Sequence, residues 1–299
     1  MPRFAAPAAL FASLLLAAPA SSRDGKKIFI SVDMEGIGGV VTGEQLGPQG
    51  FEYASFRELM TQEANAAIAA AREAGATEFV VADSHGNFQN LLPDELPPDV
   101  QLVRGGPRPH GMMQGLDASF DGVVFIGYHA STTNPAGVRA HSFSSANLAD
   151  VRVNGTSFSE GAWNAALAAH YGVPVLAVSG DEAAVDEVRA LVPGIEGAVV
   201  KWSYAFHSAR TLSPTASRAA IAAAVRKGMA RRGATNLPRA LSPIRLEIRF
   251  KSYRPAELLS WLPGAERVDA HSVAYTVKDM PEASRFLAVV LNYQADLQP

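Results

Sequence analysis

The sequence predicts an α/β protein: a three-layer α/β/α arrangement around a mainly parallel sheet, followed by a smaller α+β C-terminal region. First, β-branched runs alternate with alanine-rich helical stretches from residue 26 onward, which is typical of a parallel sheet covered by helices. Second, the composition changes in the last third. Between Trp202 and Pro255 the chain has eleven Lys or Arg residues and a single acidic residue, Glu247.

The strands of the predicted sheet are short apolar segments, as expected for strands buried on both faces. We expect them at residues 27–33, 77–82, 122–128, 151–154, 173–178 and 196–201. Helices fill the gaps. Apolar residues recur at helical spacing over residues 55–75, and Gly75 suits a C-cap. Further helices are expected from about Ser159 to Tyr171 and after Gly180, where acidic residues favour the positive end of the helix dipole.

The C-terminal region is expected to hold a helix at 214–231, a loop at 233–243 and an alternating strand at 244–250. Its basic residues suit a solvated or subunit-facing surface, or a field that attracts carboxylate-bearing substrates. Aromatic residues placed to stack bases are absent from this segment, and a net charge of −3 with a pI near 6.2 argues against a nucleic-acid partner.

The N-terminus has the layout of a secretory signal. Residues 1–20 contain Arg3, an apolar run and the small-residue triplet Ala18-Pro19-Ala20. The run is shorter than the ~20 residues that a spanning helix needs, so we expect export to the periplasm or medium and no stable membrane span. We expect the remaining chain to divide into an α/β domain, 26–212, which would be the metal-binding catalytic domain if the residues described next form a site, and an α+β region, 213–299, that is a candidate for oligomerisation.

Residues that can bind metal follow three of the predicted strands. Asp33 and Glu35 end the first strand and project to the same face, because strand residues two apart share a face. His85 follows the second strand, and His129 follows the third. The carboxyl ends of parallel strands meet at one edge of a sheet, where sites are built. Each histidine alone suits a structural role, and the acidic pair alone suits an exposed turn. Because metal-binding residues follow three separate strands, however, the sequence favours a metal site. Because the chain has no cysteine, histidines and carboxylates must hold the metal.

Two further residues complete the candidate site. Glu160 begins a predicted helix, where it could equally stabilise the dipole. His141 follows a Pro/Gly-containing loop and is either a loop histidine or an acid/base group. The other histidines, in different contexts, are expected to be structural or on the surface: His110, His170, His207 and His271.

These segments together resemble the zinc-dependent D-aminopeptidase family, typified by the enzyme of a bacterial dipeptide-transport operon. The resemblance runs in order through about residues 27–290 and is carried by "SVDMEGIGGV", "ADSHGNFQNL", "GGPRPHGMMQGLD", "FIGYHASTTNPAGVRAHS", "VNGTSFSEGAWNAALAAHYGVPVLAVSGD", "AVVKWS" and "VKDM". It implies two zinc ions per subunit, a bridging role for Asp33, and a catalytic histidine at His141. The implied metal ligands are Asp33, Glu35, His85, His129 and Glu160.

The resemblance also implies release of N-terminal D-amino acids, such as D-Ala, from short peptides, and assembly into a ring-like homo-oligomer. Zinc suits nitrogen and oxygen ligands, lowers the pKa of a water to about 7 and polarises a carbonyl. Two other functions remain open. One is a metal-dependent amidase or deacylase acting on other small amides. The other is an exported solute-binding or metal-binding protein without catalysis.

Overall fold

The computed structural model describes residues 25–231 and 240–293 of the 299-residue chain. The expected signal peptide, residues 1–20, lies outside the described residues, as does much of the expected loop at 233–243. Among the described helices, none has both the length and the apolar character needed to cross a bilayer.

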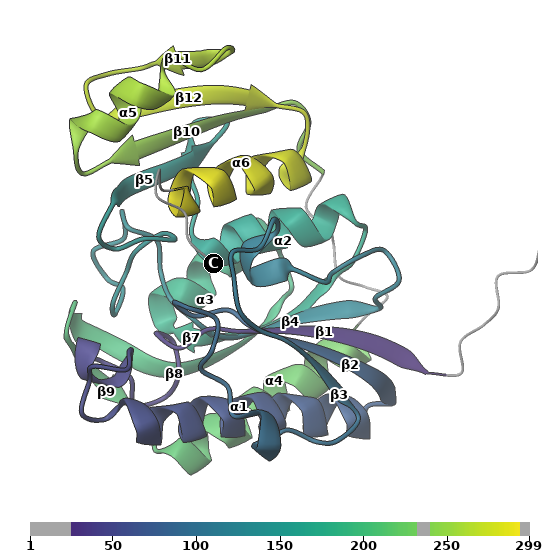
Figure 1. Ribbon diagram of the computed structural model, residues 1–299. Helices are drawn as coiled ribbons and strands as arrows, with labels where there is room; N and C mark the ends of the chain where they lie inside the picture. Colours follow the sequence, from purple (N-terminus) through teal and green to yellow (C-terminus); the bar gives the residue numbers. More distant parts are fainter. Residues whose placement is uncertain (1–24, 232–239, 294–299) are drawn as a thin grey trace, which may run out of the picture.

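The larger of two sheets is the mainly parallel sheet that the sequence predicts (Figure 1). All neighbouring strands are parallel except the last pair, β8 and β9, which are antiparallel. In spatial order the strands are β3 (Val100–Val103), β2 (Ala76–Asp83), β1 (Lys26–Val32), β4 (Gly122–Tyr128), β7 (Val175–Asp181), β8 (Glu196–Ala205) and β9 (Ser208–Thr211).

Helices cover both faces of this sheet. One face carries α1 (Tyr53–Glu73) and α4 (Pro214–Ala230), and the other carries α2 (Glu160–His170) and α3 (Glu182–Leu191) (Figure 1). β1 shows why: its alternate residues Ile28 and Ile30 belong to the core under α1 and α4, whereas Phe29 belongs to the core that contains α2 and α3. Side chains cap three of these helices at Ser159, Asp181 and Ser213.

A second, antiparallel sheet lies beyond α2 and α3 (Figure 1). Its order is β11 (Ala265–Arg267), β12 (Ser272–Val277), β10 (Ile244–Phe250), β5 (Leu148–Val153) and β6 (Thr156–Ser157). Helix α5 (Tyr253–Leu259) packs on this sheet, and α6 (Met280–Asn292) contacts both the sheet and α2. Three short 3-10 helices complete the described secondary structure: Gly43–Gln45, Pro93–Glu95 and Gly111–Met113.

The predicted fold class is confirmed, and each expected strand and helix has a counterpart. The two sheets, however, do not follow the expected boundary at residue 213. The strand expected at 151–154 is β5, which pairs with β10 of the second sheet rather than with the main sheet. Conversely, α4 packs on α1 and β8, because its apolar face, including Ile221 and Val225, completes the core of the α/β layers.

The strand order places a crevice at the carboxyl ends of β1 and β4. From β1 the chain proceeds outward to β2 and β3, whereas β4 and the later strands lie on the opposite side. Such a reversal opens a ligand crevice beyond the strand ends. The backbone joins the two strands there, since Asp33 N donates to Ile126 O at 2.8 Å and Gly36 N donates to Gly127 O at 2.7 Å.

Candidate metal centre and active site

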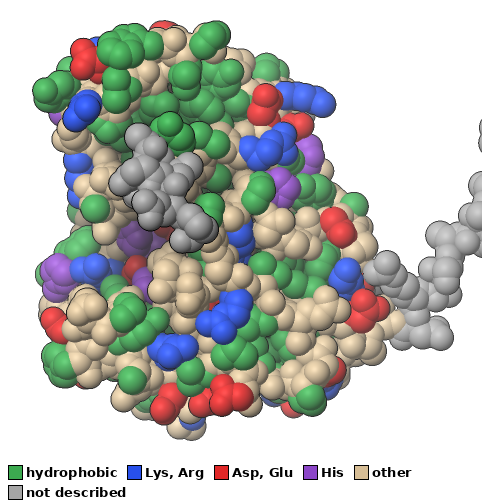
Figure 2. Space-filling model, in the orientation of Figure 1, with side chains coloured by type: hydrophobic (Ala, Val, Ile, Leu, Met, Phe, Trp, Pro, Cys, Tyr) green, Lys and Arg blue, Asp and Glu red, His purple; other side chains and the backbone are tan. Residues whose placement is uncertain are grey.

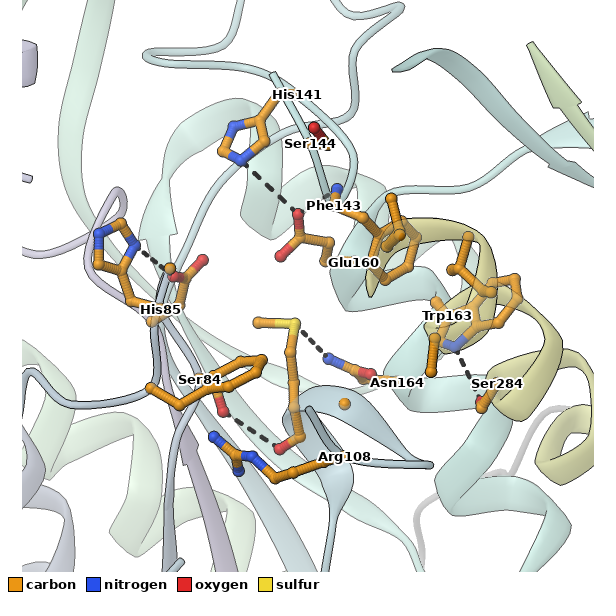
Figure 3. A pocket seen from close by; sticks show the side chains of 18 of the residues that line it. Ser84, His85, Arg108, His141, Phe143, Ser144, Glu160, Trp163, Asn164 and Ser284 are labelled. Atoms are coloured by element: carbon orange, nitrogen blue, oxygen red, sulfur yellow. Dashed lines mark hydrogen bonds and ion pairs between the residues drawn. The ribbon is translucent and has the colours of Figure 1, made fainter. Parts of the chain in front are cut away.

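The six residues expected at the site meet at this crevice. Asp33 and Glu35 follow β1, His85 follows β2, and His129 follows β4 directly. The other two come from outside the sheet: Glu160 is the first residue of α2, and His141 lies in the loop before β5. Five of the six line a cavity of about 390 Å³, in which Figure 3 labels His85, His141 and Glu160. The sixth, His129, is buried and does not line the cavity. Histidine and acidic side chains are visible in the hollow between the two sheets (Figure 2).

Asp33 lies at the centre of the cluster. One of its carboxylate oxygens is 3.4 Å from His85 Nδ1, and the other is 3.3 Å from His129 Nε2. Glu35 contacts His85 on one side at 2.8 Å, and Glu160 contacts His129 on the other at 3.4 Å. The cluster is therefore two carboxylate–histidine pairs joined by a shared aspartate, which is an arrangement suited to two cations.

Backbone carbonyls set the orientation of all three histidines. His85 Nε2 contacts Leu46 O at 2.7 Å, and His129 Nδ1 contacts Ala130 O at 3.0 Å. His141 Nδ1 likewise contacts Arg139 O at 2.9 Å. Since a carbonyl can only accept, the contacting nitrogen carries a proton, and the other nitrogen faces the cluster, where it offers a lone pair whenever the ring is neutral. Metal-binding histidines are oriented in this way.

Burial and mutual contact perturb the pKa values of the three carboxylates. Burial and the charge of Glu35 raise the pKa of Asp33 to about 8. Burial alone would raise the pKa of Glu35, but the charge and hydrogen bond of His85 outweigh it and hold that pKa well below its usual range. Glu160 follows the same pattern: burial opposes ionisation, and His129 lowers its pKa.

The histidines divide into two kinds. Burial opposes protonation of His85 and His129, yet adjacent carboxylates, first Glu35 for His85 and Glu160 for His129, raise their pKa values well above the usual range. In contrast, burial and the charge of His129 lower the pKa of His141. The two rings stack with centroids 4.0 Å apart. A neutral His141 therefore lies beside charged partners, as suits a group that exchanges protons.

The cluster fits a metal pair on its own geometry. Asp33 Oδ2 and His129 Nε2 are fully buried and have no hydrogen-bond partner among the described residues, although such groups are normally satisfied. Two overlapping sets have ligand atoms within 4.8 Å of one another: Asp33, Glu35 and His129, and His129, His141 and Glu160. With His85 at 2.8 Å from Glu35, oxygen and nitrogen donors surround two positions.

A buried lysine that we did not expect at the site supports its first loop. Lys201 is fully buried, and its Nζ donates to Glu35 O and Val40 O, each at 2.5 Å. From α1, buried Glu63 accepts from Gly38 N at 3.0 Å. Burial lowers the pKa of Lys201 to about 8 and raises that of Glu63 to about 7. The only sequence signal was a lysine inside the apolar segment "AVVKWS".

Other cavity residues were also missed. Arg108 and His110 line the cavity, although His110 was expected to be structural or on the surface. Asn164, one turn after Glu160 in α2, donates to Tyr128 Oη at 2.8 Å beneath the cavity floor. The wall opposite the sheet comes from α6, where Ser284 accepts a hydrogen bond from Trp163 at 3.2 Å.

Comparison with known proteins agrees with this geometry. The family model described as D-aminopeptidase matches residues 26–289. A D-aminopeptidase of Bacillus subtilis (strain 168) is 35% identical over 270 residues, covering 88% of this chain and 96% of that protein. The solved Zn-dependent D-aminopeptidase DppA from Bacillus subtilis, described as a self-compartmentalizing protease, matches with a TM-score of 0.85 at 33% identity, covering 89% of this chain and 96% of that one. The resemblance carried by the motifs is confirmed, and the chain belongs to the D-aminopeptidase family of hydrolases.

Proposed function

We propose that this protein is a di-zinc aminopeptidase that hydrolyses the first peptide bond of short peptides, with preference for D-residues, at the cluster around Asp33. The observation that carries the proposal is the position of Asp33, whose two oxygens face His85 and His129 at 3.4 and 3.3 Å. The D-aminopeptidase activity named for the Bacillus subtilis match, in sequence and in structure, supports it. We assign the metal ligands as Asp33, Glu35, His85, His129 and Glu160.

The protein groups divide the work of hydrolysis. Zinc, when bound, supplies the Lewis acidity that activates water and polarises the scissile carbonyl. The three carboxylates of the cluster offset most of the charge of two zinc ions, so that the free α-amine of a peptide can approach Glu35 and Glu160. His141 Nε2 carries a lone pair and lies 3.9 Å from Glu35 and 3.8 Å from Glu160. It accepts a proton from water and delivers it to the leaving amine as the C–N bond breaks.

The cavity walls favour a small first side chain such as that of D-Ala. Phe143 and Trp163 pack edge to face with ring centroids 5.4 Å apart, and both line the cavity beside Glu160. Leu287 of α6 lines the cavity as well. Bulky side chains would have to displace this apolar wall.

The test is the variant His141→Ala, assayed on D-Ala-D-Ala and L-Ala-L-Ala with zinc content measured in parallel. Because His141 moves a proton and is not assigned as a ligand, we expect kcat to fall by about 10²- to 10⁴-fold with zinc content unchanged. A loss of zinc would make His141 a ligand instead. Wild-type protein that binds two zinc ions per chain and hydrolyses neither dipeptide would contradict the proposal and favour a binding protein.

A metal-dependent amidase or deacylase is the second candidate, because the same cluster could hydrolyse other small amides. An N-acylated substrate decides between the two. An aminopeptidase needs the free amine near Glu35 and Glu160, so acetylation of D-Ala-D-Ala should abolish turnover. Equal turnover of the acetylated peptide would favour the deacylase.

We also propose export and assembly. The expected signal in residues 1–20 supports a periplasmic or secreted protein, and sequencing the N-terminus of the mature protein would test it. The description of the Bacillus subtilis relative as self-compartmentalizing supports a ring-like homo-oligomer, which sedimentation analysis would measure.

A further inference from the structure

Arg108 is a buried cation on the cavity wall that lacks a full set of partners. Its side chain lines the cavity and is only 7% exposed. The guanidinium lies over the ring of Phe88, 3.8 Å from the centroid, and Nη2 donates to Asp83 O at 2.5 Å. Nε and Nη1 have no hydrogen-bond partner among the described residues. Donors in a buried guanidinium are normally satisfied, so these two call for an acceptor.

The acidic side chain whose charge acts on Arg108, that of Asp83, already has other hydrogen-bond partners. The carboxylate of Asp83 accepts from Asn90 N at 2.5 Å, Asn90 Nδ2 at 2.8 Å and Leu91 N at 2.7 Å. These bonds fix the loop that follows His85, and the contact with Arg108 goes through the backbone oxygen of Asp83 instead. Arginine stays protonated at neutral pH, so Arg108 retains a charge that no described side chain pairs with directly.

The charges of the cavity are separated. Among the described residues that line it, Arg108 is the only lysine or arginine, whereas the carboxylates belong to the metal cluster. Figure 3 shows His141 and Arg108 at opposite ends of the labelled residues. A short peptide carries an amine at one end and a carboxylate at the other, so a peptide whose amine lies at the cluster has its carboxylate free for Arg108. A dipeptide extends about 7 Å from its amine to its carboxylate.

We propose that Arg108 binds the C-terminal carboxylate of the peptide, so that the cavity selects free dipeptides and other very short peptides over substrates without a terminal carboxylate. This inference rests on the proposed aminopeptidase function and names its substrate class more narrowly. A carboxylate matches the planar fork of a guanidinium and is held by charge-assisted hydrogen bonds. With the carboxylate on Arg108, the amine end is directed to Glu35 and Glu160.

The kinetic test compares D-Ala-D-Ala with D-Ala-D-Ala amide and D-Ala p-nitroanilide, which lack the carboxylate. We expect wild-type kcat/KM to be about 10- to 100-fold higher for the free dipeptide than for its amide, mainly through KM. Arg108→Met should remove that preference while changing turnover of the p-nitroanilide less than about threefold, and Arg108→Lys should restore part of it. The matched control is Arg72→Met, because Arg72 also stacks on a phenylalanine, Phe79, but is exposed.

A binding measurement makes the test independent of turnover. A reduced-amide analogue of D-Ala-D-Ala cannot be hydrolysed, and calorimetry should show it binding at least tenfold more weakly to Arg108→Met than to wild type. The analogue without a carboxylate should bind both alike. If Arg108→Met loses kcat/KM equally on all three substrates, or loses none on the free dipeptide, the inference is overturned while the proposed aminopeptidase function stands. If wild type hydrolyses none of the substrates, the proposed function fails, and equal binding of both analogues would reject Arg108 separately.

Discussion

Zinc binding should release about three protons from this protein at neutral pH. In the metal-free protein Asp33 has a pKa of about 8 and is largely protonated at pH 7. His85 and His129 have pKa values raised well above the usual range and are cationic. Glu35 and Glu160 have lowered pKa values and are already ionised. Ligands must be deprotonated to bind metal, so each of the first three groups loses one proton.

The same count fixes the pH dependence. Each proton released raises the logarithm of the overall zinc affinity by one per pH unit, so that affinity should climb steeply through neutral pH and level off only after pH has passed the folded pKa values of all three groups, of which that of Asp33 is about 8. The stability of the metal-free protein should instead fall as pH rises. Asp33 and the two histidines bind protons more tightly when folded, so their contribution is greatest in acid and is lost as pH rises through their folded pKa values. Stabilisation by zinc therefore grows with pH.

Calorimetric titration at pH 7 in buffers of different ionisation enthalpy measures the proton count directly. His129→Ala should release about one proton fewer and bind less zinc. His110→Ala is the control, because His110 lines the same cavity but burial lowers its pKa, so it is neutral before zinc arrives. Release of one proton or none by wild type, or an unchanged count in His129→Ala, would refute the assigned ligand set.

Two further substitutions test the support of the first metal-binding loop. A Cβ at Gly36 would lie 2.0 Å from Tyr128 O, so Gly36→Ala should cost about 1–3 kcal/mol of stability and lower zinc affinity, whereas Gly43→Ala, with nothing within 4 Å, should change neither. Lys201→Met removes a buried charge, and the lowered pKa of about 8 indicates that burying this charge costs about 3 kcal/mol of stability. The substitution also leaves two carbonyl oxygens without a donor, which costs about 1–3 kcal/mol of stability each. Stability at pH 7 should therefore change little while zinc affinity falls. Because folded Lys201 loses its proton near pH 8 and the unfolded lysine near 10.5, wild type should gain stability over that interval relative to the variant, as urea unfolding would measure.

The parts of the site that the sequence predicted are those fixed by strand ends. Asp33, His85 and His129 each follow a strand, and parallel strands bring such positions to one edge wherever the strands lie. Glu160 could be placed because a helix start is readable from its cap, here Ser159.

The parts that escaped prediction depend on contacts between distant segments. Lys201 reaches a loop far earlier in the chain, and no local pattern says where its charge goes. Arg108 lies in a loop without periodicity, so only the fold shows that it faces the cavity. The division of the strands between two sheets could not be predicted for the same reason. The sequence of β5 has the pattern of an ordinary strand, and only its pairing with β10 assigns it to the second sheet.

The pairing of β5 with β10 has a consequence for how the chain matures. β5 emerges from the ribosome well before β10, and at typical rates of synthesis the delay is on the order of ten seconds. Throughout that delay β5, which carries the apolar side chains of Leu148, Val151 and Val153, can pair only with the two-residue strand β6. The nascent protein thus exposes an unpaired, apolar strand edge until β10 has been synthesised. We expect holdase chaperones to bind the nascent chain at this strand.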